Sequence, residues 1–262
     1  MKKRNNALTG FSWLMIVFLY LPIAILILYS FNESRINAVW NGFTWKWYIS
    51  LFENRQVMQA LTNSLTIGLI SSILATVLGT AASIGIKHYS LRWRNVVNGL
   101  IYLPIVIPEI MLGLALLVLF SQMKMDLGKA TLIMAHTTFS IPFVMVIISA
   151  RLADMGKELE EAAQDLGATP WQTMRYVILP LIMPGIVAGF LMAFTLSLDD
   201  FIISFFVAGP NSTTLPLYIY GLVKRGVSPE VNALSTLLIV STVLLVIVAE
   251  LFRRKDSKTI TY

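Results

Sequence analysis

The chain has 262 residues, of which 56% are hydrophobic and only 13% are charged, and its mean hydropathy is +0.74. Soluble domains carry about 25% charged residues, so this composition argues against a water-soluble protein and indicates that lipid is the solvent. The lack of cysteine excludes disulfides and thiolate sites, and two histidines are too few for a histidine-rich metal centre. The net charge of +6 comes from short basic blocks between apolar runs, which does not indicate a nucleic-acid-binding patch.

Six apolar runs are each long enough to cross a bilayer, which takes roughly 20 mainly apolar residues in a helix. A backbone in lipid must satisfy its own hydrogen bonds, so each run is predicted to be helical. The runs cover residues 11–31, 61–86, 96–121, 128–150, 177–208 and 231–252. We therefore expect an all-α membrane protein with six spans in one domain, residues 1–262.

The basic residues between the runs predict the orientation, because Lys and Arg accumulate in cytoplasmic loops. With the N-terminus inside, the inner segments hold 13 of the 20 Lys and Arg residues and the outer segments hold seven. Both termini are therefore predicted to lie in the cytoplasm, as an even number of spans requires.

The first outer loop is rich in aromatic residues, among them Trp40, Trp45, Trp47 and Tyr48. Indole and phenol rings favour the headgroup region of a bilayer. This favours an interfacial segment over the alternative, an aromatic cage for a ligand. The second run carries small residues, including Ser71, Ala75, Gly79 and Ser83, which predict a face packed closely against another helix.

The third run contains two prolines followed by a carboxylate. Pro104 and Pro108 interrupt the helical hydrogen-bond ladder, and the carbonyls that they free can line a cavity. Glu109 comes next, and a carboxylate inside a span costs roughly 2.5–3.5 kcal/mol, so it points to a substrate path by default. A structural role for Glu109 has equal weight.

The third inner loop, residues 151–176, is predicted to hold two short helices. Its first half places an apolar stripe at helical spacing and ends at Gly167, as expected for a glycine that follows a helix. The stripe consists of Leu159, Ala162, Ala163 and Leu166. Thr169 and Pro170, followed by Gln172, then predict a capping box that starts a second helix.

This loop resembles the conserved coupling loop of ABC importer permeases. The resemblance lies in Glu161-Ala162-Ala163, then Gly167 after three residues, then Val177-Ile-Leu-Pro180 after nine more, where Val177 replaces the family's Ile. It implies a type I ABC importer permease fold in which the loop sits in a cleft of a cytoplasmic ATPase subunit. Gly167 would form the turn, with Glu161 anchoring the pair, and Thr169 and Pro170 beginning the second helix. A solvated loop without a partner is the alternative.

The fifth run contains adjacent carboxylates, Asp199 and Asp200. Neighbouring residues on a helix point about 100° apart, so at least one carboxylate faces the bundle interior. Together with Glu109 they favour a cationic substrate and would repel an anion, with Tyr102 and Phe201 as candidate cation–π walls of the path. The alternative is a structural pair that bonds to a partner permease or to backbone N–H groups.

The segment from Ser197 to Phe206 resembles the polyamine permeases of this family, and so does Gly42-Phe-Thr-Trp-Lys-Trp-Tyr48. The likeness runs along the whole chain and is nearest to the second permease of spermidine/putrescine importers. It implies alternating access in a bacterial cytoplasmic (inner) membrane. The implied partners are a second, similar permease, two cytoplasmic ATPase subunits and an extracytoplasmic polyamine-binding protein.

The chain is not expected to be an enzyme. Gly128-Lys129 lacks the upstream glycine of a phosphate-binding loop, so ATP and Mg would be bound by the partner ATPase, and no cofactor is expected here. Two other classes stay open: a secondary transporter, which would usually show repeated halves, and a non-transporting membrane scaffold. Within the importer class, an amino-acid, iron or opine substrate is the alternative to a polyamine.

Overall fold

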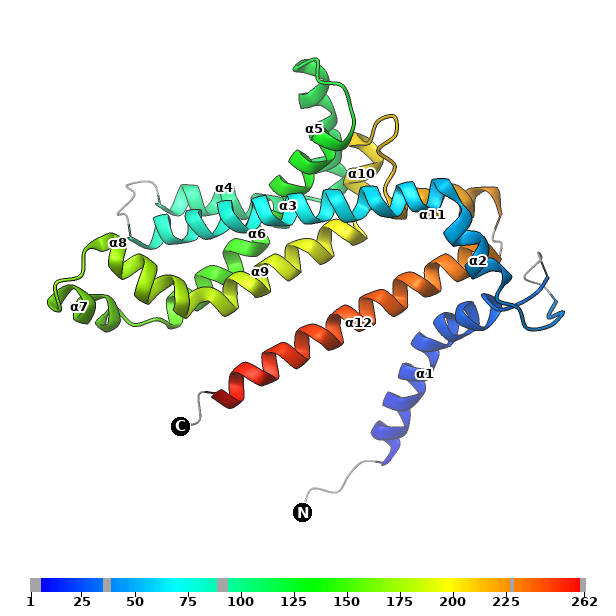
Figure 1. Ribbon diagram of the computed structural model, residues 1–262, viewed down its shortest axis with the longest axis horizontal. Coiled ribbons are helices and arrows are strands. Elements are labelled where there is room, and N and C mark those ends of the chain that lie inside the picture. The colour runs from blue at the N-terminus through cyan, green and yellow to red at the C-terminus, as the bar shows by residue number, and fades with distance from the viewer. Residues whose placement is uncertain (1–5, 35–38, 89–93, 227–228, 260–262) are drawn as a thin grey trace. The chain divides into compact units, whose positions relative to one another are not determined.

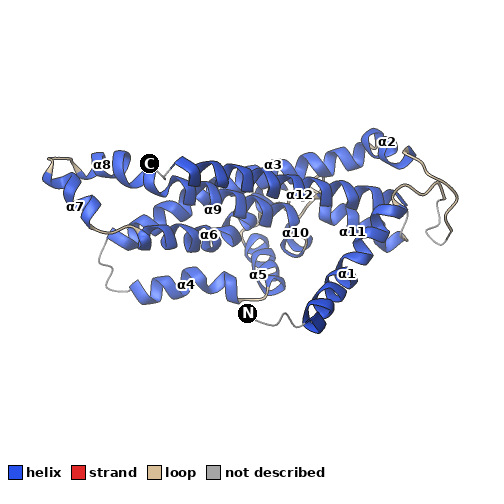
Figure 2. Cartoon of the chain, turned by 90° about the horizontal axis from the view of Figure 1, so that it is seen from below, coloured by secondary structure: helices blue, strands red, loops and turns tan. Residues whose placement is uncertain are grey.

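The computed structural model describes residues 6–34, 39–88, 94–226 and 229–259, and Figure 1 shows the chain as a ribbon. The regular structure in these ranges is helical, as Figure 2 shows. Outside the helices, the described residues contain a single isolated antiparallel bridge, between Asn32 and Phe43. The prediction of an all-α fold is confirmed.

The described helices come in the following order along the chain. They are α1 (Asn6–Tyr29), α2 (Lys46–Glu53), α3 (Arg55–His88), α4 (Arg94–Val106), α5 (Glu109–Gln122), α6 (Lys129–Asp154), α7 (Glu158–Asp165), α8 (Pro170–Thr173), α9 (Leu179–Asp199), α10 (Ile202–Val207), α11 (Leu215–Arg225) and α12 (Pro229–Thr259). A π-helical turn, Met174–Ile178, joins α8 to α9.

Two compact units make up the chain, the first formed by residues 1–58 with 218–262 and the second by residues 59–217. The single domain expected over residues 1–262 stays a prediction.

Four helical runs among the described residues are long and apolar enough to cross a membrane. They are Thr9–Tyr29, Arg55–His88, Lys129–Asp154 and Pro170–Asp199. A fifth crossing results if the bent pair α4 and α5 is counted as one span, and Pro229–Leu244 is a shorter apolar helix. The described helices thus account for four or five crossings by length and composition.

The third run, predicted over 96–121 with an interruption at its prolines, is divided into the two helices α4 and α5. The chain bends by 112° between Gly99–Val106 and Glu109–Gln122. Pro108 lies at the bend and has no N–H with which to continue the ladder, and Pro104 lies inside α4. The two prolines therefore place the break directly before Glu109.

The fifth run also differs from its predicted range of 177–208. Its helix begins earlier, at Pro170, and runs through the π-helical turn to Asp199. The backbone of Asp200 is extended, with φ −64° and ψ 120°, and α10 starts two residues later. The second short helix predicted in the loop is consequently the first part of this long run.

In the first unit, α12 packs against α1 and α2. The side chains of residues 11–25 on α1 are exposed, so this apolar helix needs lipid or another subunit around it. The aromatic loop packs on itself: the Phe31 and Phe43 rings stack with centroids 5.0 Å apart. The indole N–H of Trp47, which is buried, donates to the Asn32 carbonyl at 2.7 Å. These contacts hold the aromatic loop together, and the interfacial role predicted for it stays a prediction.

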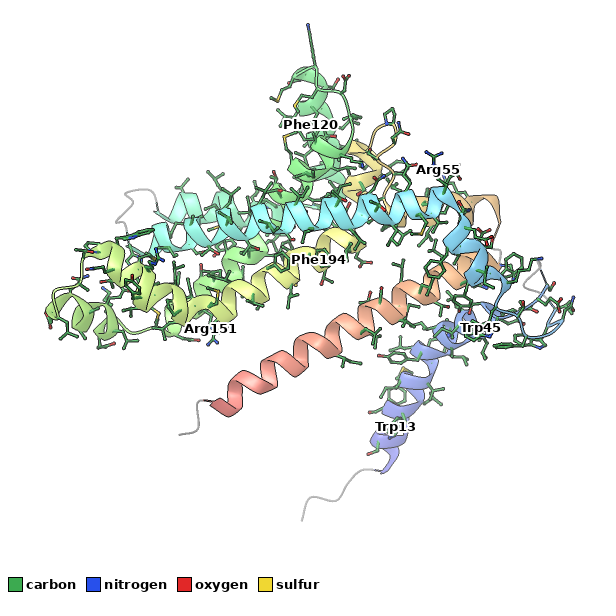
Figure 3. All side chains as sticks on the ribbon, viewed as in Figure 1. Trp13, Trp45, Arg55, Phe120, Arg151 and Phe194 are labelled. Carbon is green, nitrogen blue, oxygen red and sulfur yellow. The ribbon has the colours of Figure 1, made fainter. Side chains whose placement is uncertain are left out.

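In the second unit, α6 and α9 pack along each other and α10 packs on α5. One buried cluster gathers residues from α3, α5, α6 and α10, among them Phe120, which Figure 3 labels. A second cluster joins α3, α6 and α9 through side chains that include Val144 and Ile182. The two clusters fix α9 and α10 on either side of the Asp200 break.

The small-residue face of α3 is buried as predicted. Ser71, Ala75, Gly79 and Ser83 are all buried. A Cβ added at Gly79 would lie 2.9 Å from Cγ1 of Val144 on α6, so a larger residue has no room there. This close approach brings the polar groups of α3 within reach of α6 and α9.

Candidate functional site

The connection between α6 and α9, here called the α7 elbow (residues 155–173), ends its first helix with a Schellman turn. The N–H of Gly167 donates to the Gln164 carbonyl at 2.8 Å, and the N–H of Ala168 donates to the Ala163 carbonyl at 3.0 Å. Gly167 has φ +83°, a conformation that costs glycine little. Its predicted position just after the helix is confirmed.

The second helix of the α7 elbow starts with the predicted capping box. The backbone N–H of Gln172 donates to the Thr169 hydroxyl at 3.3 Å, and the Gln172 side chain accepts from the Thr169 N–H at 2.8 Å. Pro170 occupies the first helical position, where its missing N–H has no cost. Two local motifs thus fix the path of the chain between α7 and α8.

The α7 elbow leaves large apolar side chains uncovered by this chain. Leu166 is 90% exposed, Trp171 68% and Tyr176, just beyond the elbow, 69%. Of the predicted stripe only Ala163 is buried, while Leu159 and Ala162 are exposed together with Glu161. Apolar groups held outward on a stiff turn are typical of a protein-binding surface.

One side chain ties α7 to the end of α3. Glu160 lies 3.4 Å from Nζ of Lys87 and 3.0 Å from Nε2 of His88. The Lys87 ammonium also donates to the carbonyls of Leu152, at 2.9 Å, and Met155, at 3.5 Å, at the end of α6. Lys87 therefore joins the ends of α3 and α6 to the α7 elbow.

At the other end of the Pro170–Asp199 run, the two adjacent carboxylates have different surroundings. Asp200 is 8% exposed, and its oxygens accept from the N–H groups of Ile203, at 3.2 Å, and Ser204, at 2.8 Å. It therefore caps α10. Asp199, the last residue of α9, is exposed. The Asp200 carboxylate thus bonds to backbone N–H groups, as the structural alternative expects, whereas Asp199 points away from the packed interior.

A buried histidine on α6 completes the surroundings of Asp200. The ring of His136, 1% exposed, has Nδ1 2.6 Å from the Ser197 hydroxyl and Nε2 3.0 Å from the Ser204 hydroxyl. Nε2 is also 3.3 Å from Oδ2 of Asp200. The Ser71 hydroxyl on α3 donates to that of Ser197 at 3.2 Å. We call Ser71, His136, Ser197, Asp200 and Ser204 the His136 cluster.

Glu109 begins α5, directly after the 112° bend, and is exposed. It lies within electrostatic range of both Asp199 and Asp200. Carboxylates that are distant in the sequence thus lie within electrostatic range of one another. The predicted path aromatics Tyr102 and Phe201 are half-buried, and the ring centroids of Phe201 and Phe205 are 5.7 Å apart.

The comparisons with known proteins agree on one family. Residues 75–255, more than half of the chain, match the family described as binding-protein-dependent transport system inner membrane component. The chain belongs to this family. The matched residues of the permease contain the α7 elbow and every residue of the His136 cluster except Ser71.

Curated relatives extend the match over nearly the whole permease. The spermidine/putrescine transport system permease protein PotC of Escherichia coli (strain K12) is 43% identical over 95% of this chain and 94% of its own length. The putrescine transport system permease protein PotI of the same strain is 42% identical over 85% of this chain and 82% of its own. The resemblance to polyamine permeases is confirmed.

A solved structure supports the fold alone. A bacterial ABC transporter involved in the import of the acidic polysaccharide alginate contains a chain that matches with a TM-score of 0.73 and 21% identity. The match covers 98% of the permease and 95% of that chain. The permease therefore has the fold of an ABC importer subunit.

Sequence reasoning missed His136 and Ser204, the bond from Ser71 to Ser197, and the pairing of Glu160 with Lys87. A lone histidine in the middle of an apolar run was one available signal, because a polar ring in a span needs partners. A second signal was the pair Ser197 and Ser204, which lie seven positions apart, on either side of Asp200 in the sequence. The predicted path residues Glu109, Asp199, Asp200, Tyr102 and Phe201 stay predictions as substrate contacts.

Proposed function

We propose that the chain is the permease subunit of an ATP-driven importer that moves polyamines across the bacterial cytoplasmic membrane by alternating access. The observation that carries this proposal is the exposed Asp199 at the end of α9, with Glu109 nearby at the start of α5. The names of the relatives PotC and PotI, which are spermidine/putrescine and putrescine permeases, support the same substrate class.

A polycation suits the chemistry of this region. Among the described residues, neither Asp199 nor Glu109 forms an ion pair with a basic group, and such carboxylates attract ammonium groups and repel anions. The last carbonyls of a helix that ends inside a membrane add partial negative charge, and α9 ends at Asp199. Because Asp200 already caps α10, Asp199 and Glu109 are the carboxylates proposed to contact the substrate, with Tyr102 and Phe201 beside them.

The proposed topology has six spans with both termini in the cytoplasm. The four long apolar helices and the bent pair supply five crossings, and α12 supplies the sixth. The bias of Lys and Arg toward the inner segments supports this orientation. The contact of Lys87 with Glu160 supports it as well, because it joins two segments predicted to lie on the same side.

The α7 elbow is proposed to couple the permease to a separate ATPase. Its two capped turns hold Leu166 and Trp171 outward, where a cleft in the ATPase would bury them. Glu161 is exposed beside them and would pair with a basic group of that subunit. The ATPase partner would bind ATP and Mg, and closure of two such subunits would move the α7 elbow as a rigid body.

The complete transporter is proposed to contain this permease, a second similar permease, two ATPase subunits and an extracytoplasmic polyamine-binding protein. The exposed apolar faces of the described helices, α1 above all, leave room for a partner permease as well as for lipid. Uptake of another small cationic or amino-acid-like substrate is the second candidate, since two carboxylates also suit a singly charged amine.

The test is uptake by proteoliposomes that contain the purified complex, with the binding protein outside and ATP inside. We expect ATP-dependent uptake of labelled spermidine or putrescine that does not require an ion gradient. Asp199→Asn removes the exposed charge and should reduce uptake at least tenfold without loss of the bound ATPase subunit.

The matched control is Asp126→Asn, an exposed carboxylate between α5 and α6 and outside the predicted path. It should transport like the wild type. Equal uptake by the Asp199 and Asp126 variants would remove the case for a carboxylate path. Gradient-driven uptake without ATP would indicate a secondary transporter instead.

A further inference from the structure

His136 is a buried ionisable side chain for which neither the α7 elbow nor the exposed carboxylates provide a role. Its ring contacts Ser197, three residues before Asp200, and Ser204, two residues after the start of α10. A single side chain of α6 therefore holds both sides of the break between α9 and α10.

The contacts of the cluster connect three helices to the break. A carboxylate only accepts, so Nε2 of His136 carries the proton that faces Asp200. Nδ1 of the same ring lies 2.6 Å from the Ser197 hydroxyl, and that hydroxyl accepts from Ser71. The chain of bonds leads from α3 through α9 and α6 to the residue that caps α10.

Serine, histidine and aspartate together also occur in hydrolases, but this arrangement does not support such chemistry. Ser197, His136 and Asp200 are all buried in the packed interior. A hydroxyl that attacks a substrate needs a site open to that substrate with donors aimed at the developing oxyanion. The cluster is therefore interpreted as a structural hydrogen-bond network at the break between α9 and α10.

The cluster leaves the two adjacent carboxylates with different tasks. Asp200 uses Oδ1 for the N–H of Ile203 and Oδ2 for the N–H of Ser204 and the His136 ring. Asp199 has an exposed side chain at the last helical position before the break. Asp200 is thus bonded on the inner side of the break, and the adjacent Asp199 is exposed.

We infer that His136 is a positioning residue that acts through Asp200: it fixes the break between α9 and α10 and so presents Asp199 to the transport path. The inference rests on the proposed function only in giving Asp199 a substrate to meet. The placement of Asp199 itself can be measured without any substrate.

The measurement uses a single cysteine, because the chain contains none. Asp199→Cys is introduced into the complex assembled with its partner subunits, and its rate of labelling by a neutral, water-soluble maleimide is recorded. Thr195→Cys is the matched control, because Thr195 is exposed and lies one turn earlier on the same face of α9. The quantity compared is the ratio of the two labelling rates.

The ratio is then measured with His136→Leu and with His136→Gln. Leucine removes both polar contacts, whereas glutamine keeps a donor and an acceptor on one planar group. We expect the ratio to shift at least threefold with leucine and to return to the wild-type value with glutamine. A smaller shift with leucine, or an equal shift with glutamine, overturns the inference, and general loosening of the bundle would change both labelling rates alike.

Transport kinetics provide the second arm. His136→Leu leaves Asp200 buried without its ring partner, so we expect the maximal uptake rate of spermidine to fall at least tenfold. Adding Asp200→Asn removes the unpaired charge and should restore at least half of the lost rate. A double variant as defective as His136→Leu alone would show that His136 does not act through Asp200.

The two proposals can fail separately. A wild-type complex that takes up no polyamine, combined with the expected shift in labelling, would reject the substrate and keep the positioning role. Normal polyamine uptake, combined with an unchanged labelling ratio, would reject the positioning role and keep the substrate.

Discussion

The α7 elbow and the Asp200 break lie at opposite ends of the same helical run, Pro170–Asp199, and they are held in different ways. The elbow depends on bonds between residues three to five positions apart, such as Ala168 to Ala163 and Thr169 to Gln172. The break depends on His136 and Ser71, which are 61 and 126 residues from Ser197 in the sequence.

This difference fits the two roles proposed for these regions. A surface that docks on another subunit and moves with it must keep its own shape, so local caps suit it. A break inside a span has no water to satisfy its freed backbone groups, so neighbouring helices must supply the partners. Changes in the elbow should therefore affect contact with the ATPase, and changes at the break should affect the permease itself.

The largest effect is expected from Gly167→Asp in the α7 elbow. A side chain at φ +83° costs roughly 1–2 kcal/mol, and the new charge lies next to the apolar docking surface. We expect uptake to fall to background and the ATPase to be lost on purification. Gly167→Asn is the control, since asparagine tolerates this conformation and adds no charge. Wild-type transport by Gly167→Asp would show that the elbow carries no coupling.

Asp200→Asn should have a smaller effect, and it should lower the stability of the permease rather than its binding to the ATPase. The amide oxygen can still accept one of the N–H groups of Ile203 and Ser204, but the second acceptor is lost, at a cost of about 1–3 kcal/mol. We expect a lower thermal stability of the detergent-purified complex, with the ATPase still bound at low temperature. Asp199→Asn should leave the thermal stability unchanged. Equal stability of both variants would contradict the assignment of different roles.

Glu160→Gln should have the smallest effect. The partly exposed pairs with Lys87 and His88 are worth about 0.2–1 kcal/mol, so the permease should assemble normally. Loosening the tie between α7 and α3 should raise the number of ATP molecules hydrolysed per polyamine imported by a few-fold. Glu158→Gln, an exposed neighbour on the same helix, should not change this ratio. The two variants behaving alike would argue against a coupling role for Glu160.

The features that the sequence predicted correctly are those that depend on residues close together in the chain. Gly167 and the Thr169 capping box depend on spacings of a few positions, and the helical character of the apolar runs follows from their solvent. Proline chemistry pointed to an interruption near Pro108, although the size of the bend could not be derived, because packing of α5 against α10 decides the direction of the chain after it.

The His136 cluster could not be predicted, because it needs the relative rotation of α3, α6 and α9. Hydropathy identifies a span but does not say which side of it faces a given neighbour. The two adjacent carboxylates were predicted to point in different directions, and they do. Which of them is buried depends on Ser204 and His136, whose contacts exist only in the folded bundle.

The continuity of the helix from Pro170 to Asp199 has a mechanical consequence. Thirty residues at 1.5 Å each make a rod about 45 Å long. With a fulcrum at its midpoint, a tilt of about 10° displaces each end by about 4 Å in opposite directions. A displacement of that size at Trp171 would therefore move Asp199 by a similar distance in the opposite direction, about the width of one methylene chain, without any change in the helix itself.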